Sequence, residues 1–302
     1  PADSYKRNWK VNLSATPNTY LGIFLSSHNQ EAKKSTGVID IAYEEYKRDL
    51  PSYKTAKELM SSNVITATPE TPLEDAAKLM GEKHIGSLIV VKYQTPVGII
   101  SERDLFSKVF ALGLFLKDEK VEDIMSCPLA GVSVSASVKQ VAQALITKKG
   151  RLGVFDAGTL VGVITASDLI KCLPDVPETE LKVDDFMTKA VVYADEETSV
   201  ENIAIIMGRQ RIGSVIITRK DEHYGIFTER DLLTSFLACG RALFTDVGPE
   251  CSRPLVMIPA GTSIHRTAAT MAVKHIRRLP VVKNGKIVGI ITARDLVEAY
   301  AK

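Results

Sequence analysis

The sequence lacks several features that would point to common classes of protein. Its four cysteines stand far apart and include no Cys-x-x-Cys pair, so a zinc site built from local spacing is not expected. The longest apolar stretch, from Val109 to Leu116, has about eight residues, whereas a membrane-spanning helix needs roughly twenty. A net charge of +2 does not supply the concentrated basic face that binding to nucleic acid or an acidic membrane requires.

No motif of a common catalytic centre is present either. The chain has no Gly-x-x-x-x-Gly-Lys phosphate loop, no Gly-x-Ser-x-Gly elbow and no paired-histidine zinc motif. It also lacks the charged start, apolar core and small-residue cleavage site of a signal peptide. Thiols without a local pairing pattern are typical of a reducing compartment, with disulfides between distant pairs as the alternative. We therefore expect a cytoplasmic protein that is not an enzyme and needs no metal or catalytic cofactor.

The chain instead contains one pattern four times. A glycine is followed by two apolar residues, a serine or threonine, two further residues and an aspartate. The pattern begins at Gly98, Gly162, Gly225 and Gly289, so successive copies lie 64, 63 and 64 residues apart. Self-similarity at a fixed period marks one supersecondary unit used repeatedly, here about 60 residues long. Residues 57–302 hold the four copies, and the first 54 residues belong to none of them.

The local pattern within one copy predicts the order strand, helix, strand, strand, helix. In the first copy, the β-rich segment 62–68 stops before Pro69, and Thr71 is a candidate N-cap with Pro72 at the first helical position. An apolar helix face, two short apolar strands and a second helix capped by Ser101 follow. The helix face comprises Leu73, Ala76, Ala77 and Met80, and the strands comprise 88–91 and 96–100. In the fourth copy, Asn284-Gly285 between the two strands is a strong hairpin signal.

A unit of this size buries little surface by itself, so its sheet needs a partner. We expect units one and two, and units three and four, to pair across their sheets. Apolar linkers at 107–120 and 235–246 would pack inside each pair, and the proline-containing segment 173–182 would separate the pairs. The predicted fold class is α/β, with four repeated units and an N-terminal extension. The predicted bounds are 1–54 for the extension and 55–120, 121–178, 179–244 and 245–302 for the units.

The turn from strand to helix in each copy has the chemistry of an anion-binding site. A helix N-terminus presents unpaired N–H groups and a partial positive charge, which attract phosphate. A hydroxyl adds one hydrogen bond, and a carboxylate three residues on can accept two from the vicinal hydroxyls of a ribose. The alternative is a capping box, which any helix start can use and in which Glu would serve as well as the Asp found in all four copies. The residues concerned are Ser101 and Asp104, Thr165 and Asp168, Thr228 and Asp231, and Thr292 and Asp295.

The repeated unit with this ending resembles the CBS domain, and four copies resemble two tandem pairs, the Bateman-module arrangement. Four-repeat archaeal proteins and the gamma subunit of AMP-activated protein kinase are similar in this respect. The resemblance covers residues 57–302. It implies that the Ser or Thr of each motif contacts phosphate and that the Asp holds the ribose of AMP, ADP or ATP.

Basic residues stand at two positions around the motifs. Arginine precedes the aspartate in three of them, as Arg103, Arg230 and Arg294, whereas the second has Ser167. If phosphate binds, the Asp168 site should be the weakest or differ in ligand; otherwise these arginines are solvated surface residues. The resemblance to a His-Arg pair in the kinase gamma subunit suggests further phosphate contacts before the first core strand, with a charged helix end as the alternative. These candidates are His84, Arg211, His275, Arg277 and Arg278.

The first 54 residues contain the only tryptophan, Trp9, and are expected to pack against the repeats or form a homodimer interface. The leading functional hypothesis is an adenine-nucleotide sensor whose ligand changes the packing of the two pairs, a change that an unidentified protein partner reads. A second hypothesis is a sensor of another adenosine compound such as S-adenosylmethionine. A third is a scaffold that binds no ligand.

Overall fold

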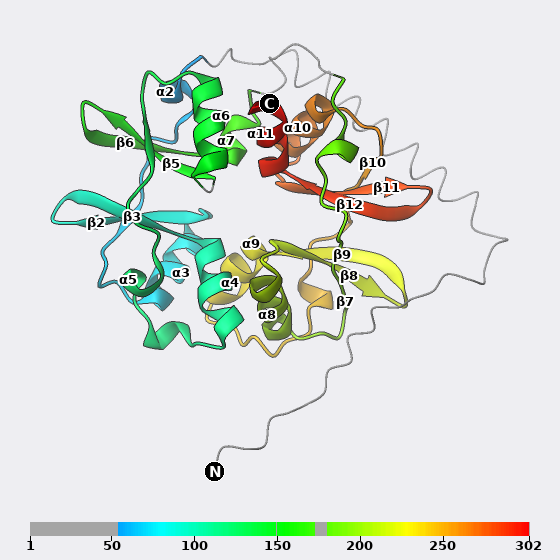
Figure 1. The fold of residues 1–302 in the computed structure, drawn as a ribbon. Helices are drawn as coiled ribbons and strands as arrows, with labels where there is room; N and C mark the ends of the chain where they lie inside the picture. The colour runs from blue at the N-terminus through cyan, green and yellow to red at the C-terminus, as the bar shows by residue number, and fades with distance from the viewer. Residues whose placement is uncertain (1–53, 149, 173–179, 302) are drawn as a thin grey trace.

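The computed structural model describes residues 54–148, 150–172 and 180–301, and the structural statements below concern those residues. Each of the four units has a three-stranded sheet and follows the predicted order strand, helix, strand, strand, helix. Figure 1 shows the four units around a common centre, with unit one (cyan) beside unit three (yellow) and unit two (green) beside unit four (red). The expected fold class is therefore confirmed.

The elements have the following bounds. Unit one contains β1 (Thr66–Ala67), α3 (Leu73–Glu82), β2 (Ser87–Lys92), β3 (Thr95–Ser101) and α4 (Glu102–Lys108). Unit two contains β4 (Gly131–Ser133), α6 (Val138–Thr147), β5 (Arg151–Asp156), β6 (Thr159–Thr165) and α7 (Ala166–Leu169). Unit three contains β7 (Tyr193–Asp195), α8 (Val200–Gln210), β8 (Ser214–Arg219), β9 (Glu222–Thr228) and α9 (Glu229–Leu232). Unit four contains β10 (Ile258–Pro259), α10 (Ile264–Val273), β11 (Arg278–Lys283), β12 (Lys286–Thr292) and α11 (Ala293–Ala301).

Short helices lie in the segments that lead into the units or join them. They are α2 (Ala56–Leu59), η1 (Phe110–Leu112), η2 (Leu116–Asp118), α5 (Val121–Ile124), η4 (Val183–Asp185), η5 (Leu233–Leu237) and η6 (Gly248–Glu250).

Within each sheet the first two strands run parallel and the last two form an antiparallel hairpin. The predicted hairpin turn at Asn284-Gly285 is confirmed, with φ of 52° and 75°. Positive φ at both central residues is typical of the turn that matches strand twist, and Asn and Gly accept it readily. Tyr93-Gln94 and Lys220-Asp221 adopt the same backbone without that sequence signal.

The first helix of unit one differs slightly from expectation. Its apolar face is fully buried as predicted, but the N-cap is Pro72 rather than Thr71, because Pro72 keeps an extended ψ of 139°. The Thr71 hydroxyl instead accepts the backbone N–H of Thr68 at 2.9 Å. The preceding strand is also shorter than predicted and comprises only Thr66–Ala67.

The units pair as predicted, one with two and three with four. The segment leading into unit one adds a bridge to the last strand of unit two, Ser61 to Val163, and unit two returns the contact through Ser126 and Ile99. Units three and four make the equivalent exchange through Thr188 with Ile290 and Ser252 with Ile226. Each unit therefore places the approach segment of its partner beside its own strand-to-helix turn.

The two large apolar cores do not lie within these pairs but between them. One core joins units one and three, through contacts of α3 with η5 and of α4 with α8. The other joins units two and four, through contacts of α6 with α11. Since every unit has one neighbour through its strands and another through its helices, all four strand-to-helix turns are directed towards the shared centre.

The two linkers inside the pairs are only partly packed, in contrast to the expectation. Val109 and Phe236 are buried, but Leu112, Phe115 and Phe244 are 69%, 66% and 80% exposed. Gly113, at φ 71°, ends η1 and turns the chain outward at the first of these sites. The expectation for residues 1–54 concerns a segment that, apart from Lys54, lies outside the described residues. Among the helices that are described, none is long and apolar enough to cross a membrane.

Candidate functional site

The four Ser/Thr-x-x-Asp motifs form the same capping arrangement in each unit. The hydroxyl residue is the N-cap of the second helix, and its backbone N–H donates to Oδ2 of the aspartate. These N to Oδ2 distances are 2.9, 2.9, 2.7 and 2.8 Å for Asp104, Asp168, Asp231 and Asp295. Each aspartate therefore does cap its helix, and this uses only Oδ2, so that Oδ1 of each carboxylate can contact another group.

The surroundings of Oδ1 distinguish the four aspartates. Asp104 is 8% exposed, and its Oδ1 contacts Lys108 Nζ at 3.0 Å and the Ser126 hydroxyl at 3.4 Å. Oδ1 of Asp231 accepts the Ser252 hydroxyl at 3.3 Å. Among the described residues, the polar contact of Asp168 Oδ1 is with Lys171 Nζ, at 3.3 Å. Burial raises the pKa of Asp231 and of Asp295 above 3.8, although their hydrogen bonds to threonine oppose this.

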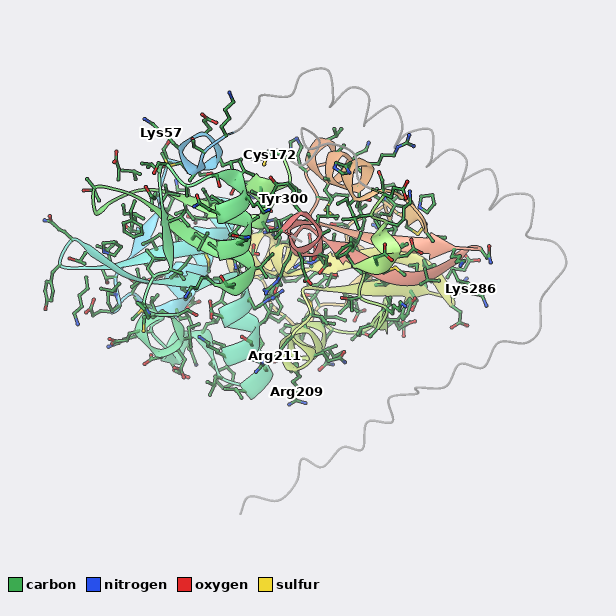
Figure 2. The ribbon with its side chains drawn as sticks, turned by 45° about the horizontal axis from the view of Figure 1, so that its top comes forward. Lys57, Cys172, Arg209, Arg211, Lys286 and Tyr300 are labelled. Carbon is green, nitrogen blue, oxygen red and sulfur yellow. The ribbon has the colours of Figure 1, made fainter. Side chains whose placement is uncertain are left out.

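A cavity of about 540 Å³ lies where the four units meet, and every unit contributes to its wall. Its size is within the range of small-molecule sites. Ten of the residues singled out in the sequence line it: His84, Arg103, Thr165, Asp168, Arg230, His275, Arg277, Arg278, Thr292 and Arg294. Six others do not line it: Ser101, Asp104, Arg211, Thr228, Asp231 and Asp295. Arg211 is exposed at the end of α8, beside Arg209 at the lower edge of Figure 2.

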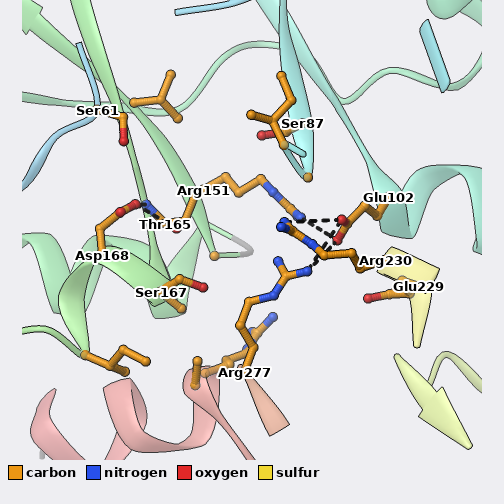
Figure 3. A pocket seen from close by; sticks show the side chains of 18 of the residues that line it. Ser61, Ser87, Glu102, Arg151, Thr165, Ser167, Asp168, Glu229, Arg230 and Arg277 are labelled. Carbon is orange, nitrogen blue, oxygen red and sulfur yellow. Dashed lines mark hydrogen bonds and ion pairs between the residues drawn. The ribbon is translucent and has the colours of Figure 1, made fainter. Parts of the chain in front are cut away.

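One end of the cavity is formed around Asp168. Thr165 and Asp168 come from the turn between β6 and α7, and Ser61 comes from the segment that pairs with β6 (Figure 3). Apolar side chains from units one, two and four line the same cavity. They are Val64, Ile65, Ile89, Val163, Met271 and Ile276. The cavity therefore combines a carboxylate and hydroxyls with apolar side chains against which a flat ring could lie.

The opposite side of the cavity holds a cluster of arginines around Glu102, which is 1% exposed. Three other units each direct one guanidinium group at this carboxylate (Figure 3). The nitrogen-to-oxygen distances are 3.3 Å for Arg277, 3.8 Å for Arg151 and 3.8 Å for Arg230. Glu102 thus forms ion pairs with arginines of units two, three and four.

A second carboxylate, Glu229, occupies the equivalent position in unit three and is 4% exposed. It accepts a hydrogen bond from Arg278 at 2.6 Å and lies 3.8 Å from Arg103. Nε of Arg230 is buried and has no hydrogen-bond partner among the described residues. Buried donors without partners are rare in native proteins, so this atom indicates room for an acceptor.

The wall of the cavity carries a net positive charge. Six arginines and one lysine stand against three carboxylates, which leaves four positive charges. Burial by itself would raise the pKa of Glu102, but Arg277, Arg151 and Arg230 lower it by more, so its pKa lies below 4.5. Burial also lowers the pKa of Arg151 and Arg230, yet an arginine stays protonated in a protein. The charge of the cavity wall therefore suits an anion better than a cation.

Three residues of this cluster, Arg151, Glu102 and Glu229, were not predicted from the sequence. A signal for them exists in the repeat. The position after the motif hydroxyl is Glu in units one and three but alanine in units two and four. The first residue of the second strand is serine in units one and three but Arg151 and Arg278 in units two and four. The glutamates of units one and three come to lie beside the arginines of units two and four only in the assembled fold, as Glu102 with Arg151 and Glu229 with Arg278 show.

The cluster also alters the expectation for the second motif. Ser167 does replace an arginine there, but Arg151 and Arg277 line the same cavity as Asp168. The cations come from other strands and another unit, so counting charges within one motif underestimates the positive charge near Asp168. Among the described residues, no group of three or more His, Cys, Asp or Glu side chains could hold a metal ion.

Comparisons with known proteins agree with this architecture. The family model described as the CBS domain matches residues 56–111, 121–175, 183–238 and 245–302. The protein MJ1225 of Methanocaldococcus jannaschii is 28% identical over 60% of this chain and 69% of its own length. A second protein of that organism, MJ1404, is 26% identical over 81% of this chain and 61% of its own. The chain thus spans about two thirds of the length of these relatives.

Two solved structures share the fold over most of the chain. The crystal structure of MJ1225, described as a candidate archaeal homologue of g-AMPK, superposes with a TM-score of 0.68 at 22% identity. The superposition covers 82% of this chain and 100% of the MJ1225 chain. A conserved protein from Pyrococcus horikoshii has a TM-score of 0.56 at 20% identity, and the superposition covers 81% of this chain and 99% of that protein.

In sequence, an inosine-5'-monophosphate dehydrogenase of Thermoplasma acidophilum is 26% identical over 82% of this chain and 53% of its own length.

Proposed function

The chain belongs to the CBS domain family, and from that premise we propose that it is a regulatory protein that binds an adenosine phosphate in the central cavity. AMP, ADP and ATP are the candidate ligands. The observation that carries the proposal is the cavity itself, in which the Asp168 carboxylate and an apolar surface stand opposite a cluster of arginines.

The arrangement supports one orientation of the ligand. The ribose hydroxyls would donate to Oδ1 of Asp168, because Oδ2 already accepts the backbone N–H of Thr165. The base would lie against Ile65, Ile89 and Val163, and the phosphates would extend towards Arg151 and Arg277. Hydrogen bonds between guanidinium and phosphate are charge-assisted and can be bidentate, which suits arginine to this position.

Regulation would follow from the origin of the arginines. The guanidinium groups around Glu102 belong to three other units, and both paired modules contribute to the cavity. A phosphate that draws these groups together changes contacts between the modules, because Arg230 and Arg277 belong to the other module from Glu102. A ligand can shift such packing only by the difference in its affinity for the two arrangements. A protein partner would read the shift, and the chain itself would catalyse no reaction.

The two alternatives from the sequence are less well supported. S-adenosylmethionine carries a sulfonium cation and no phosphate, so it would gain little from four net positive charges. A scaffold without ligand leaves the buried Nε of Arg230 without a role. The remaining aspartates, Asp104, Asp231 and Asp295, stay predicted sites, as does cytoplasmic location.

A panel of ligands tests the proposal by thermal denaturation and calorimetry of the full chain. A nucleotide at a hundredfold excess over its dissociation constant should add about 2.7 kcal/mol to the free energy of unfolding for each site. AMP, ADP or ATP should raise the melting temperature, whereas adenosine and S-adenosylmethionine should do so far less. Inorganic phosphate at matched ionic strength is the control for simple anion binding. If no nucleotide raises the melting temperature or gives heat of binding, the scaffold hypothesis replaces this proposal.

A further inference from the structure

Two buried glutamates compete with any phosphate for the arginines of the cavity. Glu102 and Glu229 directly follow the motif hydroxyl of units one and three, where units two and four have Ala166 and Ala293. A helix cap does not need a carboxylate at this position, because the aspartate two residues on already closes the capping box. The capping box is therefore complete without the two glutamates, whose side chains pair with arginines of other units.

The surrounding residues make space for these ion pairs. A Cβ atom at Gly86 would lie 3.0 Å from Cδ of Glu102, and one at Gly213 would overlap the guanidinium of Arg278. Gly86 and Gly213 occupy the same position of the repeat; unit two also has a glycine there, Gly150, and only unit four differs, with Arg277. The glycines at 86 and 213 therefore leave room for the Glu102 carboxylate and the Arg278 guanidinium. Both of these groups form ion pairs with residues of other units.

The ion pairs around Glu102 are loose. Its three arginine partners lie at 3.3 to 3.8 Å, whereas strong charge-assisted hydrogen bonds are about 2.7–2.9 Å long. Arg278, by contrast, holds Glu229 at 2.6 Å. The Glu102 carboxylate is shared among three guanidinium groups, so a phosphate could take these groups over while the carboxylate stays beside it.

We propose that Glu102 and Glu229 are resident counter-charges that limit the number of phosphates the cavity accepts. This inference rests on the proposed function, in which an adenosine phosphate occupies the cavity. Each carboxylate cancels part of the arginine charge and repels the phosphates directly. Because coulombic repulsion grows in proportion to the charge of the ligand, a triphosphate is penalised more than a monophosphate. The two glutamates therefore set the preference of the site among AMP, ADP and ATP.

The experiment is a calorimetric titration of AMP and ATP into the wild-type chain and the variants Glu102→Gln and Glu229→Gln. Glutamine keeps the shape of the side chain and removes the charge. The affinity for ATP relative to AMP should rise by about tenfold or more in Glu102→Gln. Glu229→Gln should change the same ratio in the same direction. Glu250→Gln is the control, because Glu250 pairs with Arg241 at 2.7 Å and does not line the cavity.

Several outcomes separate this inference from the proposed function. Nucleotide binding to the wild type with an unchanged ATP to AMP ratio in both variants overturns the inference alone. No nucleotide binding to any of the proteins overturns the proposed function and the inference together. The ratio is measured on one protein preparation, so a variant of lower stability still gives an answer. Inorganic tripolyphosphate and orthophosphate should reproduce the trend without adenosine, and equal gains for both would contradict a dependence on ligand charge.

Discussion

The pair of variants Asp168→Ala and Asp104→Ala separates a ligand-binding role of the repeated aspartate from helix capping. Both carboxylates accept the N-cap backbone N–H at 2.9 Å, so both variants lose the same capping bond. The difference lies in Oδ1. In Asp104 it is already held by Lys108 and Ser126, away from the cavity, whereas in Asp168 it belongs to a residue of the cavity wall.

The expected magnitudes follow from these contacts. Loss of a cap costs about 0.5–2 kcal/mol of stability, so both variants should unfold more easily by that amount. A hydrogen bond between a charged group and a hydroxyl contributes about 1.5–3 kcal/mol, so only Asp168→Ala should also weaken nucleotide binding in the central cavity, by roughly tenfold to a hundredfold. Asp168→Glu should restore much of the cap but displace the carboxylate from the ribose, and should bind weakly.

The assays are urea denaturation for stability and calorimetric titration with ADP for affinity at the cavity. Parallel losses of stability with a loss of affinity in Asp168→Ala alone would support the account. Unchanged affinity in Asp168→Ala, with lowered stability in both variants, would mean that the aspartates only cap helices. That result would refute nucleotide binding by Asp168 in the central cavity.

Two further predictions concern stability. The pKa of Glu102 lies below its usual 4.5 in the folded chain. Its ion pairs therefore contribute stability that is present above pH 4.5 and is lost as the pH falls through the folded-state pKa. Wild type and Glu102→Gln should therefore differ most above pH 4.5 in urea denaturation, and the difference should shrink on acidification; a constant difference would contradict the charge assignment. Gly208→Ala should destabilise the chain by about 1–3 kcal/mol, because the new methyl group would overlap the carbonyl oxygen of Phe106 where α8 meets α4. A gain of about 1 kcal/mol, as for an exposed helical glycine, would show that the two helices can separate freely.

The units were predictable from the sequence because the signals within them are local. The apolar face of α3 and the cap at Ser101 depend on residues only a few positions apart, and both were found in the structure. Hairpin turns were less accessible, since Tyr93-Gln94 adopts positive φ without the Asn-Gly signal that marks 284–285.

The central cavity could not be predicted in the same way. It depends on packing between the paired modules, where apolar helix faces look alike whichever partner they meet. A weak hint was present in Gly81 and Gly208, which occupy equivalent helix positions in units one and three. A Cβ at Gly81 would lie 2.5 Å from the carbonyl oxygen of Leu233. Such glycines indicate close helix contact, but they do not identify the partner helix, so the contacts of Glu102 with Arg230 and Arg277 of the other module could not be predicted.

The most direct test of the central claim is a crystal structure of the chain grown with ADP. We predict one nucleotide in the cavity at the centre of the four units, with its ribose hydroxyls on Oδ1 of Asp168 and its phosphates on Arg151 and Arg277. A nucleotide bound only at Asp104, Asp231 or Asp295, with no ligand beside Asp168, would contradict the account.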